Sequence, residues 1–134
     1  MISEFQGDFR FLSNFWPCVI EFEGIKFSSV EHAYQAAKTL DIKERKRIAK
    51  LLTPGKAKRA GQELKIRPDW EEIKLSIMRE LLIKKFSHRE LMFRLKLTEG
   101  ELIEGNNWGD TFWGICRGKG ENHLGKLLME IRDN

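Results

Sequence analysis

A glutamate, a glutamine and a lysine recur along one predicted helix in the stretch SSVEHAYQAAK, residues 28–38. An α-helix turns by about 100° per residue, so Glu31, Gln35 and Lys38 fall at positions i, i+4 and i+7 on one stripe. A carboxylate, an amide and an ammonium group would then line the wall of whatever cavity this stripe faces. The chemistry that such a stripe could support is proton transfer by the carboxylate.

The same stretch also has a structural interpretation. Ser28 and Glu31 match the Ser-x-x-Glu capping box, in which the glutamate folds back onto the serine amide and starts a helix. From this stretch alone the cap is the favoured interpretation, although the two roles are compatible. His32 titrates near neutrality but is favoured as a packed or hydrogen-bonded residue, and Tyr34 can face a ligand or close the core.

The most informative polar segment is LIEGNNWGDTFWGICRGKGENHLG, which lies between the last two predicted helices. Trp108 and Trp113 can stack on a planar base, and Asp110 can accept a proton or face a developing cation. Alternatively, one tryptophan fills the core and Asp110 forms a turn with Gly109; we expect this for one of the tryptophans and not for the whole set. Irregular connections of this length are usually functional or disordered, and the tryptophans argue against disorder.

Two further segments carry polar groups in unusual settings. In FLSNFWP the amide of Asn14 lies beside Phe15 among other aromatic residues, so it needs partners, either backbone groups or a ligand. In RGKGEN, Lys119 and the backbone amides before Asn122 could hold a phosphate at a helix N-terminus. A tight turn followed by an asparagine cap would give the same sequence.

Composition limits the class of protein. A chain of 134 residues fits one domain, residues 1–134, with a single core. The longest apolar runs are too short to cross a membrane, and the N-terminus lacks the pattern of a signal peptide. Cys18 and Cys116 lack the spacing of a zinc site or a disulfide scaffold, so we expect no metal or other cofactor and a cytoplasmic location.

The charge balance is mildly basic, with a net charge of +4 and a pI near 9.1. Glutamates are interspersed among the lysines and arginines, so a solvated helix surface is the favoured explanation. A nucleic-acid partner is possible, and a phosphate-bearing small molecule fits the same bias.

The elements that must position these residues are mostly helical. Alternating apolar residues on both sides of Glu23-Gly24 predict a short hairpin over residues 19–27. One buried face is expected for the helix that carries Glu31, through Val30, Ala33, Tyr34, Ala37 and Leu40. Caps at Asp41, at Thr53-Pro54 and in a Ser87–Glu90 capping box mark later helix starts. Helices are predicted over residues 29–40, 41–52, 53–61, 68–86, 87–97 and 122–132, which gives a predominantly α-helical α+β fold.

In order along the chain, FLSNFWP, SSVEHAYQAAK, the Pro54-x-x-Ala57-x-x-x-Gly61 segment, RPDWEEIK, LIEGNNWGDTFWG and GKGENHLGKLLMEIR resemble the NADAR superfamily. The resemblance covers nearly the whole chain, and within the superfamily the chain is similar to the YbiA-like N-glycosidases and also to domains that remove ADP-ribose from guanine bases. Trp16 stands where a tyrosine is commoner, and Ala33 beside the histidine is a second departure. Both bear on pocket shape and substrate choice.

The resemblance implies a pocket for a ribose phosphate or ADP-ribose group attached through nitrogen to a base. In this hypothesis Glu31 and Asp110 are opposed carboxylates, one of which handles protons while the other faces the cationic sugar. Lys38 is either an ammonium partner of Glu31 or a nucleophile that forms a Schiff base. The expected substrate-binding residues are Asn14, Phe15, Tyr34, Gln35, Trp108, Trp113, Gly114, Lys119 and Asn122.

The expected function is hydrolysis of riboflavin-pathway intermediates, small nucleotide-like substrates, with release of ribose 5-phosphate. Removal of ADP-ribose from guanine in ADP-ribosylated nucleic acid is one alternative, and a non-catalytic module that binds ADP-ribose or NAD is another. A general RNA-binding domain ranks lowest. No membrane partner is expected, and the oligomeric state is left open.

Overall fold

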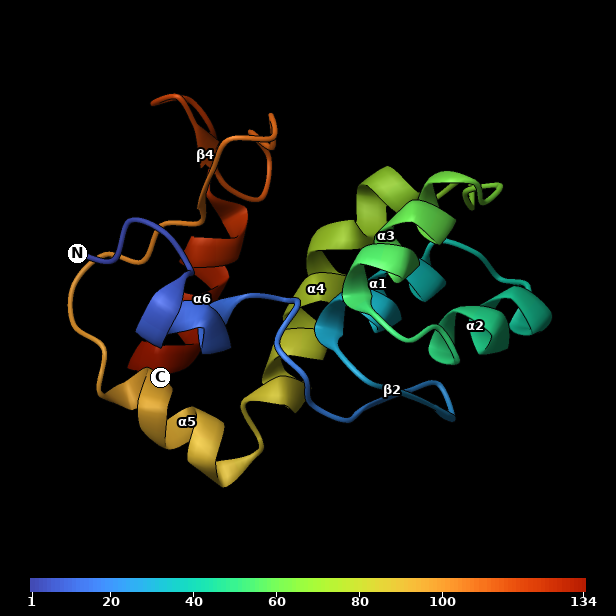
Figure 1. The fold of residues 1–134 in the computed structure, drawn as a ribbon, viewed down its shortest axis with the longest axis horizontal. Coiled ribbons are helices and arrows are strands. Elements are labelled where there is room, and N and C mark those ends of the chain that lie inside the picture. Colours follow the sequence, from blue (N-terminus) through green and yellow to red (C-terminus); the bar gives the residue numbers. More distant parts are fainter. The chain divides into compact units, whose positions relative to one another are not determined.

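The computed structural model describes residues 1–134 (Figure 1). The chain forms two compact units, which we call unit 1 (Met1–Ser13 and Phe86–Asn134) and unit 2 (Asn14–Lys85). Six α-helices, one 3-10 helix and two small two-stranded sheets make up the regular structure. The predicted α+β class with mainly helical content is therefore confirmed, whereas a single domain over residues 1–134 stays a prediction.

Unit 2 begins with the predicted hairpin. Strands β1 (Ile20–Phe22) and β2 (Ile25–Phe27) pair antiparallel. Glu23 and Gly24 form the two-residue turn with φ angles of 47° and 83°, and positive φ at both central residues is the geometry that matches the twist of a tight hairpin. Val19 is exposed, so the inner face is formed by Ile20, Phe22 and Phe27.

Four helices complete unit 2: α1 (Val30–Ala37), α2 (Ile42–Ala49), α3 (Pro54–Gln62) and α4 (Trp70–Lys85). Helix α1 packs against the other three (Figure 1), and all eight of its residues are buried. The prediction of a helix with one buried face is therefore wrong for α1. Leu40, predicted to continue that face, lies beyond the helix end and is 64% exposed.

Two predicted helix starts in unit 2 are confirmed by their hydrogen bonds. Oδ1 of Asp41 accepts a hydrogen bond from the amide of Lys43 at the start of α2, and Oγ1 of Thr53 accepts one from the amide of Lys56 in α3. Both side chains satisfy backbone donors that the helix itself leaves unpaired.

The start of α1 differs from the prediction. Ser29 is the N-cap, and its Oγ accepts a hydrogen bond from the amide of His32 at 3.1 Å. The backbone amide of Glu31 donates instead to the carbonyl of Asn14. The predicted cap at Ser28 is therefore wrong by one residue, because Ser29 caps the helix through the amide of His32.

Unit 1 contains the 3-10 helix η1 (Gly7–Leu12), α5 (Arg89–Lys96), the short parallel strands β3 (Gly105–Asn106) and β4 (Ile115–Cys116), and α6 (His123–Asp133). The N-cap of α5 is His88, which makes no capping hydrogen bond through its side chain, so the predicted Ser87–Glu90 capping box is wrong. The buried apolar residues of unit 1 include Phe11, Leu12, Leu91, Leu95, Leu124 and Leu128.

Candidate functional site

A buried carboxylate and a buried amide form the centre of the polar stripe on α1. Gln35 donates a hydrogen bond of 2.7 Å from Nε2 to Oε2 of Glu31, one helical turn earlier. Glu31 is 9% exposed and Gln35 is 4% exposed. Because burying a charge without a partner is costly, this hydrogen bond both stabilises the Glu31 carboxylate and fixes its direction.

Gly61 of α3 leaves the space that the Gln35 side chain occupies. A Cβ atom at Gly61 would collide with Oε1 and Cδ of Gln35. That Oε1 atom is buried and has no hydrogen-bond partner. The sequence indicated Gly61 only as the residue that ends the helix, which is wrong because α3 continues through it to Gln62. The signal for its role beside Gln35 was the Pro-x-x-Ala-x-x-x-Gly segment.

Lys38 follows α1 directly and is partly buried. Burial lowers the pKa of its ammonium group, while the Glu31 carboxylate acts in the opposite direction and Lys58 and Lys74 lower the pKa further. The charges of Glu31 and Lys38 therefore interact, as their spacing on one stripe predicted. A lysine held in this way loses its proton more readily than one in water.

Aromatic rings pack beside the polar stripe. The rings of Tyr34 and Trp70 lie 5.1 Å apart at 56°, and both residues are largely buried. Nζ of Lys38 lies 5.6 Å from the centroid of the Tyr34 ring, within the range of a cation–π contact. Trp70, the first residue of α4, thus packs against Tyr34, which lies between Glu31 and Lys38 in the chain. The sequence did not reveal this role of Trp70.

Asn14 lies next to the start of α1. Its Nδ2 donates a weak hydrogen bond of 3.6 Å to Sδ of Met78, and its buried Oδ1 has no partner. A methionine sulfur is a weak acceptor, so most of the hydrogen-bonding capacity of this amide remains for another group. Phe15, the next residue, is half-buried. Ligand binding by these two residues stays a prediction.

His32 is a structural residue, as the sequence interpretation favoured. Its Nδ1 lies 2.7 Å from Oγ of Ser29, and its Nε2 lies 2.9 Å from the carbonyl oxygen of Leu51. The carbonyl can only accept, so Nε2 carries the proton. Burial lowers the pKa of the ring, and the hydrogen bond to Leu51 opposes this change.

Asp110 organises the irregular segment of unit 1. Its Oδ1 accepts hydrogen bonds from the amides of Phe112 and Trp113, at 3.1 and 2.9 Å. Asn106 bonds both sides of the Asp110 backbone, donating to its carbonyl and accepting from its amide. Asp110 thus has the turn-forming role that the sequence left open, and a catalytic role for it stays a prediction.

Asn122 and Gly114 also shape this segment. Nδ2 of Asn122 donates to the carbonyl of Leu102, and its Oδ1 accepts from the amide of Glu104, both at 2.9 Å. Both ends of this buried amide are therefore used by the backbone. A Cβ at Gly114 would collide with Glu104, so a larger residue has no space there. Substrate contacts by Asn122 and Gly114 remain untested.

The two tryptophans of the segment have different surroundings. Trp113 packs edge-on against Phe112, with ring centroids 4.8 Å apart. Trp108 is 55% exposed and lines a cavity of about 480 Å³ together with Gln6, Asn106 and Asn107. Lys119 is exposed and closes a tight turn with Cys116 through backbone hydrogen bonds, the alternative that its sequence allowed. Stacking on Trp108 and phosphate binding by Lys119 stay predictions.

The predicted site residues divide between the two units. The group in unit 2 consists of Asn14, Phe15, Glu31, Tyr34, Gln35 and Lys38, and the group in unit 1 consists of Trp108, Asp110, Trp113, Gly114, Lys119 and Asn122. Within unit 2, Glu31 contacts Gln35 and Lys38 contacts Tyr34; within unit 1, Asp110 contacts Trp113. Glu31 and Asp110 belong to different groups, so their pairing as opposed carboxylates stays a prediction.

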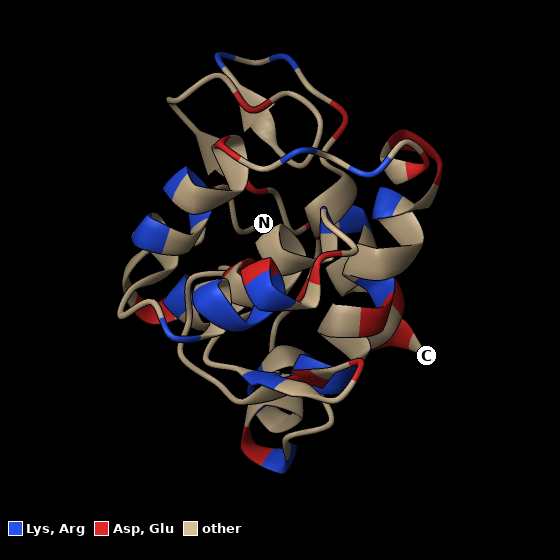
Figure 2. Cartoon of the chain, turned by 90° about the vertical axis from the view of Figure 1, so that its right-hand side faces the viewer, with Lys and Arg blue, Asp and Glu red and all other residues tan.

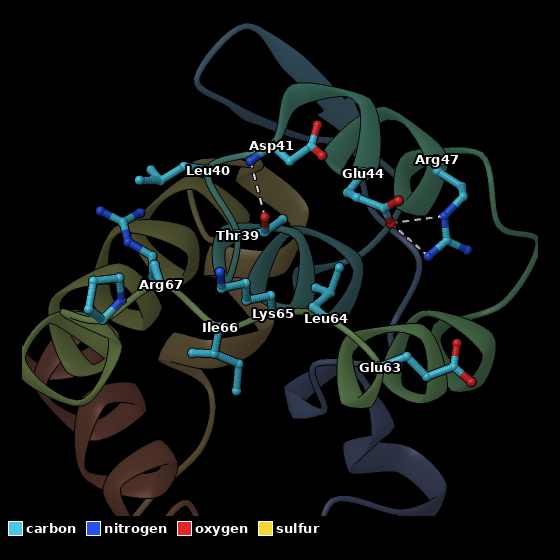
Figure 3. Close-up of a pocket in the computed structure, with 11 residues that line it drawn as sticks. Thr39, Leu40, Asp41, Glu44, Arg47, Glu63, Leu64, Lys65, Ile66 and Arg67 are labelled. Carbon is cyan, nitrogen blue, oxygen red and sulfur yellow. Dashed lines mark hydrogen bonds and ion pairs between the residues drawn. The ribbon is translucent and has the colours of Figure 1, made fainter.

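A cavity of about 530 Å³ lies elsewhere in unit 2, beyond the C-terminus of α1 (Figure 3). Two of its three cations bind acids, Arg47 to Glu44 and Arg67 to Asp69, whereas Lys65 is exposed. None of the predicted site residues lines this cavity. The lining includes Thr39, Leu40, Asp41, Leu64, Lys65 and Ile66.

No helix is both long and apolar enough to cross a membrane.

Comparison with known proteins identifies the family. The model of the NADAR domain matches residues 3–134. N-glycosidase YbiA from Escherichia coli (strain K12) is 39% identical over 137 residues, which cover 98% of this chain and 82% of that protein. The riboflavin biosynthesis protein VVA0006 from Vibrio vulnificus (strain YJ016) is 33% identical over 92% of this chain but 35% of its own length.

The fold agrees with this comparison. The NMR structure of E. coli YbiA matches 99% of this chain and 85% of that chain with a TM-score of 0.84 at 35% sequence identity. Sequence, family model and three-dimensional structure thus agree over nearly the whole chain, and the protein belongs to the NADAR family.

Proposed function

We propose that the protein is an N-glycosidase that hydrolyses the bond between a ribose phosphate and a nitrogen base, with early riboflavin-pathway intermediates as substrates. The observation that carries the proposal is the buried Glu31 carboxylate, which Gln35 holds by a hydrogen bond within reach of the charge of Lys38. Its similarity to a protein named N-glycosidase supports the reaction type, and its similarity to a protein named for riboflavin biosynthesis supports the substrate class.

In the proposed reaction the bond between C1 of the ribose and the base nitrogen breaks, and positive charge develops on the sugar. Water adds through its oxygen to C1, and one proton of that water ends on the leaving nitrogen. Glu31 moves this proton, because a fixed carboxylate within a buried site is suited to general acid–base catalysis. The positive charge of Lys38 attracts the Glu31 carboxylate and helps to orient it.

Asp110 of unit 1 would stabilise the cationic sugar through its carboxylate. Trp108, which is exposed beside a cavity, would stack on the base. These two roles follow from the family resemblance and rank below that of Glu31. Release of ADP-ribose from guanine in nucleic acid uses the same bond chemistry and is the second candidate. A cytoplasmic location also stays a prediction.

The test is to compare purified wild type with Glu31→Gln on two substrate panels. One panel holds ribosylaminopyrimidine phosphates of the riboflavin pathway, and the other holds DNA with ADP-ribosylated guanine. We expect wild type to release ribose 5-phosphate from the first panel and Glu31→Gln to lose at least about 100-fold in rate, the usual contribution of a general acid or base. Glu72→Gln, at an exposed position of α4, is the matched control.

Circular dichroism and thermal melting establish that the variants are folded. Wild-type release by a folded Glu31→Gln variant would overturn the assigned role of Glu31. Activity on the DNA panel alone would change the substrate class. Tight binding of ADP-ribose without turnover on either panel would instead make the protein a binding module.

A further inference from the structure

The mild net charge of the chain conceals a strong local excess. Residues 41–67, which include α2 and α3, carry ten lysines and arginines against three acids, a net charge of +7 in a chain whose total is +4. The remaining residues therefore sum to −3. If lysines, arginines and acids were evenly mixed on solvated helices, no segment of the sequence would carry so large an excess of positive charge.

The structure places this excess on the solvent side of two helices. In α2 the buried face is formed by Arg45 and Ile48. The opposite face carries cations at positions i, i+3, i+4 and i+7, which fall within one third of the helix circumference. Four side chains form this stripe, and all are exposed: Lys43, Lys46, Arg47 and Lys50.

Few of these cations are neutralised by acids. Three of the ten pair with acids: Arg47 with Glu44, Arg67 with Asp69 and the buried Arg45 with Glu23. Asp41 is occupied as the cap of α2. Six exposed cations of the two helices and their flanks have no side-chain partner; they are Lys43, Lys46, Lys50, Lys56, Arg59 and Lys65. Lysine and arginine segments are drawn in blue in Figure 2, in a view that faces the side of Figure 1 on which α2 lies.

We propose that the exposed face of α2 and α3 binds the phosphate backbone of double-stranded nucleic acid. An array of unpaired cations releases condensed counterions when it contacts phosphates, which is the main source of affinity in such complexes. A single strand fits less well, because proteins that bind single strands add aromatic stacking. The exposed large hydrophobic residues of residues 41–67 are all aliphatic: Ile42, Leu52 and Ile66.

A membrane surface also fits less well than a duplex. An amphipathic helix that lies on a membrane inserts the apolar face opposite its cations, whereas the opposite face of α2 is buried inside unit 2. Because contacts to phosphates carry no sequence information, we expect this binding to be independent of sequence. The surface adjoins the candidate site, because α2 and α3 both pack against α1, which carries Glu31 and Gln35.

The experiment is fluorescence anisotropy of the full chain with a fluorescein-labelled 20-base-pair DNA duplex over a range of NaCl concentrations. The test variant combines Lys43→Glu, Lys46→Glu and Lys50→Glu. The control combines Lys26→Glu, Arg89→Glu and Lys126→Glu, which lie at exposed positions outside the surface and change the net charge equally. Thermal melting confirms that both variants fold.

We expect the α2 variant to weaken duplex binding at least about tenfold and to reduce the slope of log K against log salt by roughly 2 to 3, since each phosphate contact contributes about 0.9. The control should change binding by less than about threefold. Equal weakening by both variants would show that only net charge matters and would overturn the proposal. Binding of wild type to phosphatidylserine vesicles but not to the duplex would also overturn it. Neither measurement depends on turnover, so the proposed N-glycosidase activity can fail independently.

Discussion

The Gln35 amide donates a 2.7 Å hydrogen bond to the Glu31 carboxylate across one turn of a helix whose every residue is buried. Reversing the amide would place its oxygen against the carboxylate, so Glu31 determines the orientation of Gln35 as much as Gln35 determines that of Glu31. Gly61 completes this arrangement because it alone leaves space for the Gln35 side chain on α3.

Substituting Gly61 tests this arrangement without touching the carboxylate. We expect Gly61→Ala to displace Gln35 and to lower kcat/KM at least about tenfold, because a hydrogen bond to a charged group contributes about 1.5–3 kcal/mol. Gly55→Ala, in the same helix, is the control, since a Cβ there meets only Oγ1 of Thr53 at 4.0 Å. Steady-state kinetics and thermal melting should show normal activity for Gly55→Ala. Equal kinetics for both variants would exclude a positioning role for Gln35.

The lowered pKa of Lys38 predicts how activity depends on pH. Burial lowers the pKa, so the ammonium loses its charge below the ordinary lysine value of about 10.4. If Lys38 acts as a cation, activity falls as pH rises through the lowered pKa. Lys38→Arg, which stays charged, should keep part of the activity and move the fall to higher pH.

A Schiff-base role predicts the opposite behaviour for Lys38. A free amine gains activity as pH rises, arginine cannot replace it, and borohydride inactivates the enzyme only in the presence of substrate. We expect the first pattern, because the Glu31 carboxylate stabilises the charged form. Rate measurements between pH 6 and 10 and mass spectrometry after borohydride treatment distinguish the two.

Two substitutions separate the structural and catalytic roles of Asp110. Asparagine keeps an oxygen for the amides of Phe112 and Trp113, whereas alanine removes it. Asp110→Ala should therefore lower the free energy of unfolding by about 0.5–2 kcal/mol, as for loss of a helix cap, and Asp110→Asn should lower it much less. If Asp110→Asn melts like wild type but loses activity, the charge is catalytic. If it also keeps activity, Asp110 is only a turn residue.

Lys85, which is fully buried on α4, makes stability depend on pH. Burial lowers its pKa to about 7, and the nearby Cys18 opposes this change. In the unfolded chain the pKa returns to about 10.4. Between these values the unfolded state binds more protons, so the contribution of Lys85 to the free energy of unfolding rises with pH.

The measurement is urea denaturation of wild type and Lys85→Met at several pH values. The stability of wild type relative to Lys85→Met should rise by up to about 1.4 kcal/mol per pH unit above pH 7 and stay level below it. Exposed Lys26, substituted by methionine, provides the control. A difference that does not vary with pH between 6 and 9 would show that Lys85 keeps its charge when buried.

Much of this protein could be predicted from local sequence. The hairpin around Glu23-Gly24, the caps at Asp41 and Thr53 and the boundaries of most helices depend on neighbouring residues, so residue type and spacing determine them. The motifs that resemble the NADAR family were equally visible, because the residues of each motif lie close together in the chain. The stripe of Glu31, Gln35 and Lys38 followed from helix geometry alone.

Tertiary packing decided the remaining features. The sequence suggested a capping box for Glu31. In the structure Ser29 caps the helix, the backbone amide of Glu31 donates to the Asn14 carbonyl, and its carboxylate accepts a hydrogen bond from Gln35. Helix α1 is buried because it packs against three helices that lie further along the chain. Likewise, a side chain at position 61 is excluded by Gln35, which is distant in the sequence. Spacing along one helix determines which side chains share a face, but only packing determines how far each is removed from water, and that removal gives Lys38 and Lys85 their lowered pKa values.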